Sequence, residues 1–383
     1  MKKKKIKVAN ILEEARVGGP QIRLLLLAKA LRNKVNVTAI LPKKNSSNFI
    51  KKCKKFNVNY ILSNLSNLSR SPLNIISYLV LFPFEIIMLM LVFKKNKFDL
   101  VHVSGGAWQY KGVIAAKLSG IKVIWELNDS YAPFIIKFIF NYLNFFADSF
   151  IYGSISTEKY YKKLISNNKK NFLIQSPVDI NFFNPSISYP SKNFLKKNKN
   201  KVVVGAVTNI NPIKGLDTFL LSAKELLHHQ KNITFVVIGE IHQTQKKYYN
   251  QLINLQKKLN IRNFFFLGKQ EDVRPFIKLI DIYVCSSISE SSPLSVWEAM
   301  SMKKAIVSTN VGDVKKYIKN GRNGFVVNVN DSKIMAKKIK LLVQEPKLRN
   351  LFGKRSRIIA KNNFDVKLFG KKNFMAYRKT VNI

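Results

Sequence analysis

Ser289-Glu-Ser-Ser-Pro-Leu-Ser-Val-Trp-Glu-Ala-Met-Ser-Met302 decides the fold of this chain, together with the apolar run Ile282–Cys285 just before it. The apolar run predicts a strand, and the Ser/Pro segment predicts a polar loop. A helix is expected to follow, with Pro293 in its first turn, where the missing N–H has no partner to lose. Strand, loop and helix in this order form the junction at which open α/β sheets bind ligands. Glu290 falls in the loop and Glu298 in the helix, although either glutamate taken alone also fits a capped surface helix.

The same alternation of apolar strands with helical segments runs through both halves of the chain. The runs that predict strands are Lys7–Leu12, Val35–Leu41, Tyr60–Leu62, Asp99–Ser104, Val123–Leu127, Ser149–Tyr152, Val202–Val207, Thr234–Ile238, Phe264–Leu267, Ile282–Cys285, Ala305–Ser308 and Phe325–Val327. This pattern predicts an α/β fold of two doubly wound, Rossmann-like domains that face each other across a cleft. The length of 383 residues also favours two domains.

A shift in composition separates the two halves. Residues 186–200 are rich in Ser, Pro, Asn and Lys and poor in apolar residues, as in a linker. We therefore expect one domain over residues 1–185, a second over 201–363, and a separate C-terminal segment, 364–383.

The composition is strongly basic. Lys and Arg number 66 against 21 Asp and Glu, giving a formal net charge of +45, which attracts nucleic acid, anionic lipid or phosphate-rich substrates. Because the lysines are spread along the chain and no nucleic-acid motif is present, we expect no nucleic-acid partner. Biased codon usage is an alternative source of the lysine excess. Two cysteines, Cys53 and Cys285, cannot form a disulfide framework, so a reducing, cytoplasmic compartment fits.

Two apolar stretches in the first half suggest contact with a membrane. Tyr78–Phe93 is interrupted by Pro83 and Glu85, so the sequence predicts no membrane span, which would need about 20 apolar residues. Tyr131–Phe146 is a similar apolar stretch of the same length and contains Lys137. Each stretch alone fits core packing. Both together in a basic chain favour peripheral contact with the inner face of an anionic cytoplasmic membrane.

Four segments of the second half follow predicted strands and should meet at one edge of its sheet: Asn209–Lys214, Gly239-Glu240, Lys269–Val273 and Glu290–Glu298. Together they offer a cation, helix N-termini and two carboxylates. Positive charge suits a diphosphate and carboxylates suit sugar hydroxyls, so a nucleotide sugar fits this set.

With these motifs the sequence resembles the retaining glycosyltransferases of family 4, the glycosyl transferases group 1, which have the GT-B fold. The matching segments are Asn209–Gly215, Phe266–Val273, Ser289–Met300, Val311-Gly312 and Asn320–Phe325, with weaker similarity at Gly18-Gly19-Pro20 and Asp99–His102. Val366–Thr380 resembles the helix that crosses back to the first domain. The resemblance covers most of the chain. It implies transfer of a hexose from a nucleotide-diphosphate sugar to a hydroxyl of a lipid-linked glycan or surface polysaccharide.

The resemblance also implies roles for single residues. Lys214 would neutralise the leaving diphosphate, Glu298 would bind the ribose, and Glu290 the donor sugar. The residues implied to contact the donor through backbone or base are Gly18, Gly19, Gly239, Lys269, Val273, Ser292, Pro293 and Leu294.

The chain departs from the family pattern at two places. Asn209 stands where most members have a second cation, and Glu126 and Asp129 stand near the position where many members have a His, which makes all three candidate catalytic residues. No Asp-x-Asp occurs, so neither a metal ion nor a cofactor is expected. Two alternatives remain open on the sequence, a sugar-nucleotide epimerase with the same fold and a non-catalytic binding module.

Overall fold

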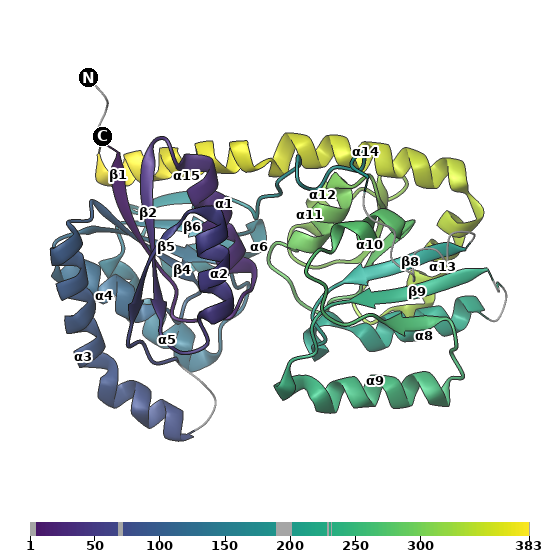
Figure 1. Ribbon diagram of the computed structural model, residues 1–383, viewed down its shortest axis with the longest axis horizontal. Helices are drawn as coiled ribbons and strands as arrows, with labels where there is room; N and C mark the ends of the chain where they lie inside the picture. The colour runs from purple at the N-terminus through teal and green to yellow at the C-terminus, as the bar shows by residue number, and fades with distance from the viewer. Residues whose placement is uncertain (1–4, 68–71, 189–200, 228–229, 231, 383) are drawn as a thin grey trace. The chain divides into compact units, whose positions relative to one another are not determined.

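The computed structural model describes residues 5–67, 72–188, 201–227, 230 and 232–382. It divides into two compact units (Figure 1), the first formed by residues 1–177 with 366–383 and the second by residues 178–365. The chain thus passes into the second unit after Pro177, earlier than the predicted linker 186–200, most of which lies outside the described residues.

The first unit is built on a parallel sheet with the order β3-β2-β1-β4-β5-β6-β7 among the described residues. Its strands are β1 (Ile6–Ile11), β2 (Val35–Pro42), β3 (Asn59–Ser63), β4 (Leu100–Gly105), β5 (Lys122–Leu127), β6 (Ser149–Tyr152) and β7 (Lys170–Leu173). Runs of Val and Ile buried on both faces favour this parallel arrangement. The order changes direction between β1 and β4, which makes this the topological switch point of the sheet.

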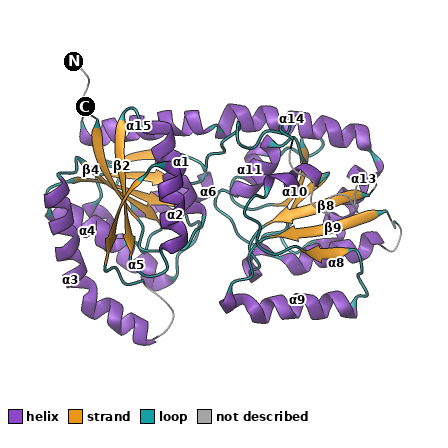
Figure 2. Ribbon diagram, in the orientation of Figure 1, coloured by secondary structure: helices purple, strands orange, loops and turns teal. Residues whose placement is uncertain are grey.

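Helices cover both faces of the first sheet (Figure 2). They are α1 (Gly19–Leu31), α2 (Ser47–Phe56), α3 (Pro72–Asn96), α4 (Tyr110–Leu118), α5 (Phe134–Leu143), α6 (Ile155–Tyr161) and α15 (Val366–Val381), with short 3-10 turns at η1 (Asn144–Phe146) and η2 (Lys162–Leu164). One apolar layer joins the sheet to α3, α4 and α5 around Trp125. On the other face, Phe369 and Tyr377 of α15 pack beside Leu27 of α1, so the end of the chain is part of this unit.

The second unit repeats the architecture with the parallel order β10-β9-β8-β11-β12-β13 among its described residues. Its strands are β8 (Val202–Val207), β9 (Ile233–Ile238), β10 (Phe264–Phe266), β11 (Ile282–Cys285), β12 (Ala305–Thr309) and β13 (Gly324–Val327). Its helices are α8 (Leu216–Leu227), α9 (Lys246–Lys258), α10 (Arg274–Leu279), α11 (Leu294–Ser301), α12 (Val314–Tyr317), α13 (Ser332–Gln344) and α14 (Pro346–Phe364), with 3-10 turns at η3 (Pro212–Lys214) and η4 (Gln243–Gln245). The predicted pair of doubly wound sheets is confirmed.

Helix α3 differs from its prediction. It continues unbroken through Pro83, and Ile75–Asn96 is the one helix in the described part of the chain that is long and apolar enough to cross a membrane by length and composition. The side chain of Pro83 lies on the solvent side of the helix, where the loss of one backbone hydrogen bond is best tolerated. Only 22% of the most apolar 18-residue stretch of α3 is buried within the protein.

Candidate functional site

The second sheet changes direction between β8 and β11. From β8 the chain adds β9 and β10 on one side, and from β11 it adds β12 and β13 on the other. The carboxyl ends of the strands at such a point are where open α/β sheets bind ligands. The loops after β8 and β11, residues 208–215 and 286–293, hold Asn209, Lys214, Glu290, Ser292 and Pro293. These residues thus lie in loops that follow strands, as the local strand and loop signals in the sequence predict.

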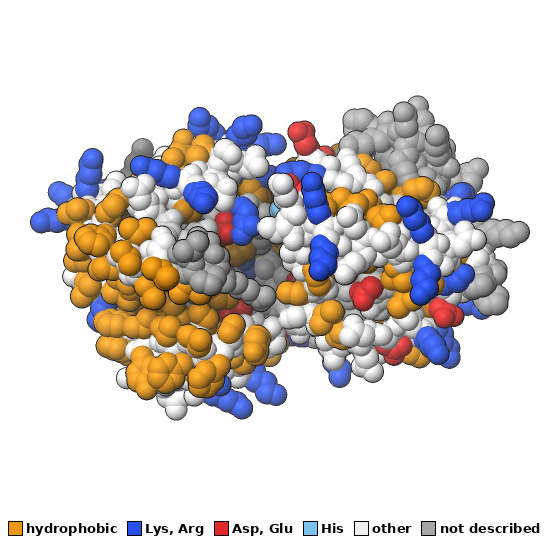
Figure 3. Space-filling view, turned by 90° about the horizontal axis from the view of Figure 1, so that it is seen from below, with side chains coloured by type: hydrophobic (Ala, Val, Ile, Leu, Met, Phe, Trp, Pro, Cys, Tyr) orange, Lys and Arg blue, Asp and Glu red, His pale blue; other side chains and the backbone are white. Residues whose placement is uncertain are grey.

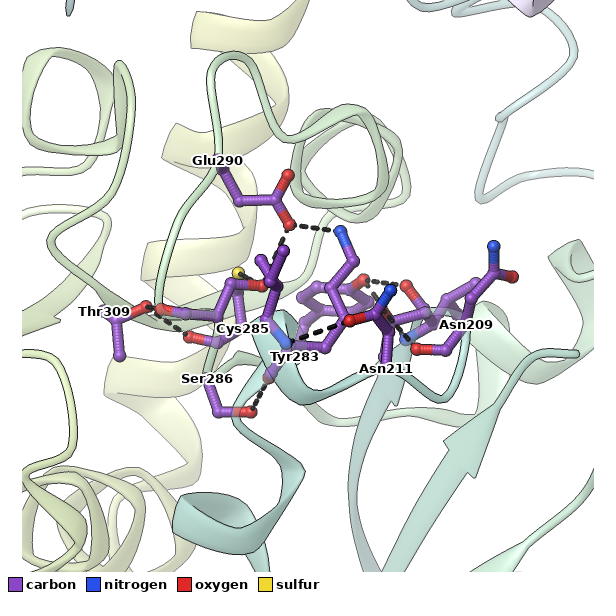
Figure 4. Close-up of polar contacts among 12 residues, drawn as sticks. Asn209, Asn211, Tyr283, Cys285, Ser286, Glu290 and Thr309 are labelled. Atoms are coloured by element: carbon purple, nitrogen blue, oxygen red, sulfur yellow. Dashed lines mark hydrogen bonds and ion pairs between the residues drawn. The ribbon is translucent and has the colours of Figure 1, made fainter. Parts of the chain in front are cut away.

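An ion pair joins the two loops. Lys214 Nζ lies 2.6 Å from Glu290 Oε1, and the Ser287 hydroxyl donates to the same oxygen at 2.9 Å (Figure 4). The two charged side chains are 26% and 19% exposed, so a ligand from solvent can reach both. Without a donor, the carboxylate holds the ammonium group in place. With a nucleotide sugar present, the same two groups can contact phosphate and sugar hydroxyls.

Backbone contacts fix the loop that carries Lys214. The carbonyl of Ile213 accepts a hydrogen bond from Ile288 N at 2.7 Å, and the Ser286 hydroxyl donates to the Lys214 carbonyl at 2.9 Å. Gly215 follows with φ +56°, and a Cβ there would collide with the Ser286 carbonyl. Only glycine fits this position, because the backbone there is left-handed and lies too close to the residue that follows β11 to leave room for a side chain. Lys214 is therefore held on a rigid backbone.

Asn209 is placed differently from Lys214. Its side chain is exposed, and in Figure 4 its amide lies at the far end of the polar group from Glu290. The neighbouring Asn211 makes the structural contact instead, since its side-chain oxygen accepts from Ile213 N at 3.0 Å. The structure brings Lys214 and Glu290 together but does not bring Asn209 to them.

Glu298 lies on α11, five residues into the helix. Its side chain is partly buried, and burial raises the pKa of Glu298 to about 8. Desolvation is the cause of this shift, and no opposite charge offsets it. Hydroxyl donors, such as those of a ribose, would lower the raised pKa of this carboxyl group, because their hydrogen bonds stabilise its ionised form.

The start of α11 differs by one residue from the prediction. Pro293 precedes the helix rather than lying in its first turn, and its carbonyl accepts the first helical hydrogen bond from Val296 N at 3.0 Å. Leu294 is the first helical residue, and the Ser292 hydroxyl accepts from Trp297 Nε1 at 3.0 Å. The amides of the first helical turn have no partners within the helix and suit a phosphate or a sugar hydroxyl.

The loops after β9 and β10 lie on the other side of β8. Gly239 N donates to Gly268 O at 3.0 Å, and Lys269 Nζ lies 3.0 Å from Glu240 Oε1, with both of these side chains exposed. Val273 stands directly before α10 and is partly buried. These loops adjoin the loop after β8, because Ile210 N donates to Glu240 O at 3.0 Å. The predicted base-binding residues thus share the edge that holds Lys214.

In the first unit, Gly18 and Gly19 lie at the start of α1, directly after the β1 loop. Gln21 closes this turn, since its side-chain oxygen accepts from Gly18 N at 3.0 Å and its amide donates to Glu14 O at 2.6 Å. No atom lies within 4 Å of a Cβ built at Gly19, so this backbone faces open space. That exposure is what close approach to a ligand requires.

Glu126 does not take the position predicted for a catalytic group. It is 2% exposed, and its carboxylate pairs with Arg23 Nε at 2.8 Å and His102 Nε2 at 3.0 Å. His102 Nδ1 in turn lies 2.7 Å from the hydroxyl of Tyr377 on α15. Despite the burial, the Arg23 guanidinium and then His102 hold the pKa of Glu126 well below its usual range. Glu126 therefore joins α1 and α15 to the sheet in a buried polar network.

Asp129 is the better-placed acidic residue of the first unit. It follows β5 at the carboxyl edge, and its Oδ2 accepts from the Tyr161 hydroxyl at 2.5 Å. Its Oδ1 has no hydrogen-bond partner in the described part of the chain, and burial raises the pKa of Asp129 to about 6. Because this oxygen is also shielded from solvent, a substrate hydroxyl could reach it only after a local rearrangement.

Sequence reasoning missed two residues that shape the site. Arg23 is a buried charge inside the apolar helix α1, and a lone charge in an apolar run is the signal that marks such residues. Ser287 holds Glu290 but is one of several serines in its loop, so nothing in the sequence distinguishes it. Among the described residues, no group of three or more His, Cys, Asp or Glu side chains is arranged to hold a metal ion.

Comparison with known proteins adds the following. The family model "Glycosyl transferases group 1" matches residues 190–358. The chain is 26% identical over 298 residues to the UDP-Gal:alpha-D-GlcNAc-diphosphoundecaprenol alpha-1,3-galactosyltransferase of Escherichia coli, covering 74% of this chain and 76% of that protein. It is 26% identical over 262 residues to the N,N'-diacetylbacillosaminyl-diphospho-undecaprenol alpha-1,3-N-acetylgalactosaminyltransferase of Campylobacter jejuni, covering 67% of each chain.

Solved structures agree on the fold. A glycosyltransferase from Rickettsia africae superposes with a TM-score of 0.83 at 21% identity, over 98% of this chain and 99% of that chain. The GT-B fold predicted from the sequence is thus confirmed. The curated relatives support transfer of a sugar over epimerisation and over a purely binding role.

Proposed function

We propose that this chain, whose residues 190–358 match the glycosyl transferases group 1 model, transfers a hexose from a UDP-sugar, with retention of configuration, to a glycan carried on a polyprenyl diphosphate. The observation that carries the proposal is the Lys214–Glu290 pair at the switch point of the second sheet. One cation and one carboxylate, held 2.6 Å apart on two rigid loops, match a sugar diphosphate, in which phosphate and hexose are joined directly.

The names of the two relatives support the acceptor and the linkage. Both act on a sugar attached to diphosphoundecaprenol, and both form an alpha-1,3 linkage. The Escherichia coli enzyme uses a UDP-sugar by name. A uridine diphosphate donor and a lipid-linked acceptor are therefore the first substrates to test, and the identity of the hexose is left to that test.

The geometry suggests how the residues divide the work. Negative charge develops on the leaving phosphate as the glycosidic bond breaks, and Lys214 with the amides at the start of α11 is already in place to meet it. Glu290 contacts the hexose and Glu298 the ribose. The leaving phosphate itself can accept the proton of the acceptor hydroxyl, so no side-chain base is needed. Asp129 is proposed to accept a hydrogen bond from a substrate hydroxyl, and no step uses a metal ion.

An apolar surface on the first unit suits a lipid-linked acceptor. Figure 3 shows hydrophobic side chains gathered over much of this unit. The apolar side chains of α3 and the α5 segment that are more than half exposed form what we call the apolar face: Ile76, Leu79, Val80, Phe84, Ile87, Leu91, Phe134, Ile135, Phe138, Tyr142 and Phe145. Lys94, Lys95, Lys97 and Lys137 are exposed around it. Apolar side chains rimmed by lysines fit peripheral binding to an anionic membrane, which we place at the cytoplasmic face.

Helix α3 is proposed to lie on the membrane rather than to cross it. A spanning helix meets lipid or other membrane segments all around, whereas one side of α3 is part of the first unit's core, with Leu89 and Phe93 fully buried. The same side carries Glu85, which pairs with the buried Lys111 at 2.5 Å. Withdrawing α3 from the unit would break this buried ion pair at a high energetic cost.

Substituting serine for Leu79, Phe84 and Leu91 together is expected to reduce vesicle binding by more than tenfold. Each side chain is over 60% exposed, so the change removes apolar area from the surface and leaves the core intact. Co-sedimentation with vesicles containing anionic lipid measures the effect. The matched control replaces Leu221, Ile334 and Leu351, exposed on the second unit, and should bind as the wild type does. Equal binding by both triple variants would exclude the apolar face as the membrane surface.

The proposed reaction is tested by incubating the purified chain with UDP-galactose, UDP-N-acetylgalactosamine, UDP-glucose or UDP-N-acetylglucosamine. The acceptor is a sugar linked through diphosphate to a polyprenol. We expect release of UDP that depends on the acceptor, and an α-linked product by NMR. A β-linked product would contradict retention. Release of UDP with a free disaccharide but not with the lipid-linked sugar would contradict the acceptor class.

A further inference from the structure

The first unit contains a second group of charges that the proposed reaction does not use. Glu13 follows β1, Glu85 lies on α3, and Lys111 lies in the first turn of α4. Their residues are 4%, 4% and 0% exposed. Glu13 and Lys111 flank the switch point between β1 and β4, the place where an α/β sheet holds ligands. We call these three residues the buried charge cluster.

Lys111 is the centre of the cluster. Its Nζ lies 2.5 Å from Glu85 Oε2, and it donates to the Ser66 carbonyl at 2.7 Å and the Ser66 hydroxyl at 2.9 Å. It also lies 3.9 Å from the ring centre of Tyr78, on the same helix as Glu85. The ammonium group is therefore paired closely with α3 and the segment before it.

Glu13 is the more weakly paired partner. Its Oε2 lies 3.9 Å from Lys111 Nζ, and its Oε1 accepts from Lys111 N at 3.3 Å. Its own backbone N donates to Gln109 Oε1 at 2.9 Å. Burial, only partly offset by Lys111, raises the pKa of Glu13 to about 7. Lys111 thus holds Glu13 through its backbone N–H as well as through charge.

Glu13 begins the loop that ends at Gly18 and Gly19. The far end of this loop is fixed by Gln21, which bonds Glu14 O and Gly18 N. The near end is fixed through Glu13, whose backbone N–H donates to Gln109 and whose carboxylate accepts from the backbone N–H of Lys111. The shape of the loop therefore depends on a lysine whose own position is set by α3.

Stability does not explain such a cluster well. Burying three charges costs free energy that ion pairing seldom repays in full, so apolar side chains of similar size would often be as stable. A buried charged group instead specifies one geometry, because any displacement leaves an unpaired charge.

We propose that Lys111 is a positioning residue, which sets the conformation of the loop from Glu13 to Gly19 and links that loop to α3 through Glu85. The inference rests on the proposed function in one respect, namely that this loop contacts the substrate. The dependence of the loop conformation on Lys111 and Glu85 does not rest on any proposed reaction.

Hydrogen exchange tests whether the conformation of the loop depends on Lys111 and Glu85. The variant with Lys111→Met and Glu85→Gln removes one positive and one negative charge together, and the buried Glu13, whose pKa is about 7, can take up a proton once Lys111 is gone. Thermal unfolding checks that this variant folds. Exchange of the amides in residues 14–19 should become at least tenfold faster than in the wild type. Lys117→Met, an exposed lysine on the same helix, is the matched control and should change nothing. Wild-type exchange in residues 14–19 of the double variant would overturn the proposal.

Two single variants and steady-state kinetics test the link to α3, the role of the lysine charge and the role of the loop separately. Glu85→Gln alone should also speed exchange in residues 14–19, and its failure to do so would overturn the link to α3. Lys111→Arg keeps the charge and should restore slow exchange at least in part, whereas exchange as fast as in the double variant would contradict positioning through charge. In steady-state kinetics the double variant should raise the substrate KM more than it lowers kcat. Faster exchange with unchanged KM and kcat would leave the positioning intact and exclude the loop's role in the proposed function.

Discussion

Lys214→Ala is expected to lower kcat by about 10²–10³-fold, as happens when one preorganised donor to a developing charge is lost. The resemblance to the glycosyl transferases group 1 implies a second cation where this chain has Asn209, and the exposed Asn209 amide lies away from Glu290 in Figure 4. Lys214 must then meet most of the phosphate charge together with the first-turn amides of α11, whose helix dipole contributes roughly 0.3–2 kcal/mol. The diphosphate is charged before the reaction as well, so KM should also rise, though less than kcat falls.

The fold should survive this substitution. The Lys214–Glu290 pair is partly exposed, and ion pairs of this kind contribute only about 0–1 kcal/mol to stability. Thermal unfolding therefore serves as the folding control, and Lys333→Ala, an exposed lysine on α13, controls for the loss of one charge. Turnover of Lys214→Ala within a few-fold of the Lys333→Ala value would exclude Lys214 as the group that neutralises the leaving phosphate.

The site of the second unit could be predicted because its signals are local. Each of its loops follows an apolar strand directly, and turn residues such as Gly215 and Pro293 mark where the strand ends and the next element begins. A parallel sheet then brings the strand ends together without any further information. The prediction was off by one residue at Pro293, because proline fits equally well just before a helix and in its first turn.

The first unit was harder to predict because its important contacts are distant in sequence. Glu126 looks like a site residue by position, yet its partners Arg23 and His102 come from α1 and β4, and His102 in turn contacts Tyr377 of α15. No local pattern connects these segments. Pro83 interrupts the apolar stretch in the sequence, yet α3 continues through it, because packing of α3 against the unit outweighs the loss of one hydrogen bond at an exposed position.

Donor affinity should rise about tenfold per pH unit between pH 6 and pH 8 and level off above pH 8, because the pKa of Glu298 is about 8. A ribose diol donates two hydrogen bonds to a carboxylate, so binding favours the ionised form and releases the proton that the free protein holds below pH 8. Such charge-assisted hydrogen bonds contribute about 1.5–3 kcal/mol each. Glu298→Ala should therefore weaken binding of the nucleotide by about 100-fold at pH 8.5. Isothermal titration with UDP across this pH range measures both effects.

Glu298→Gln separates the charge from the shape of the side chain. The amide cannot ionise, so its affinity for UDP should be low and constant with pH, whereas Glu225→Gln, at an exposed glutamate on α8, should keep the wild-type pH profile. The pH dependence of folding stability gives a second test of the Glu298 pKa. The folded-state pKa of Glu298 is raised above its ordinary value of 4.5, so the carboxyl group favours the folded state at low pH and loses that contribution as the pH rises toward 8. Relative to the wild type, Glu298→Gln should gain more than about 1 kcal/mol of stability between pH 5 and pH 9. A stability difference that does not change with pH would show that Glu298 is not desolvated, and a pH-dependent affinity in the glutamine variant would assign the proton release to another group.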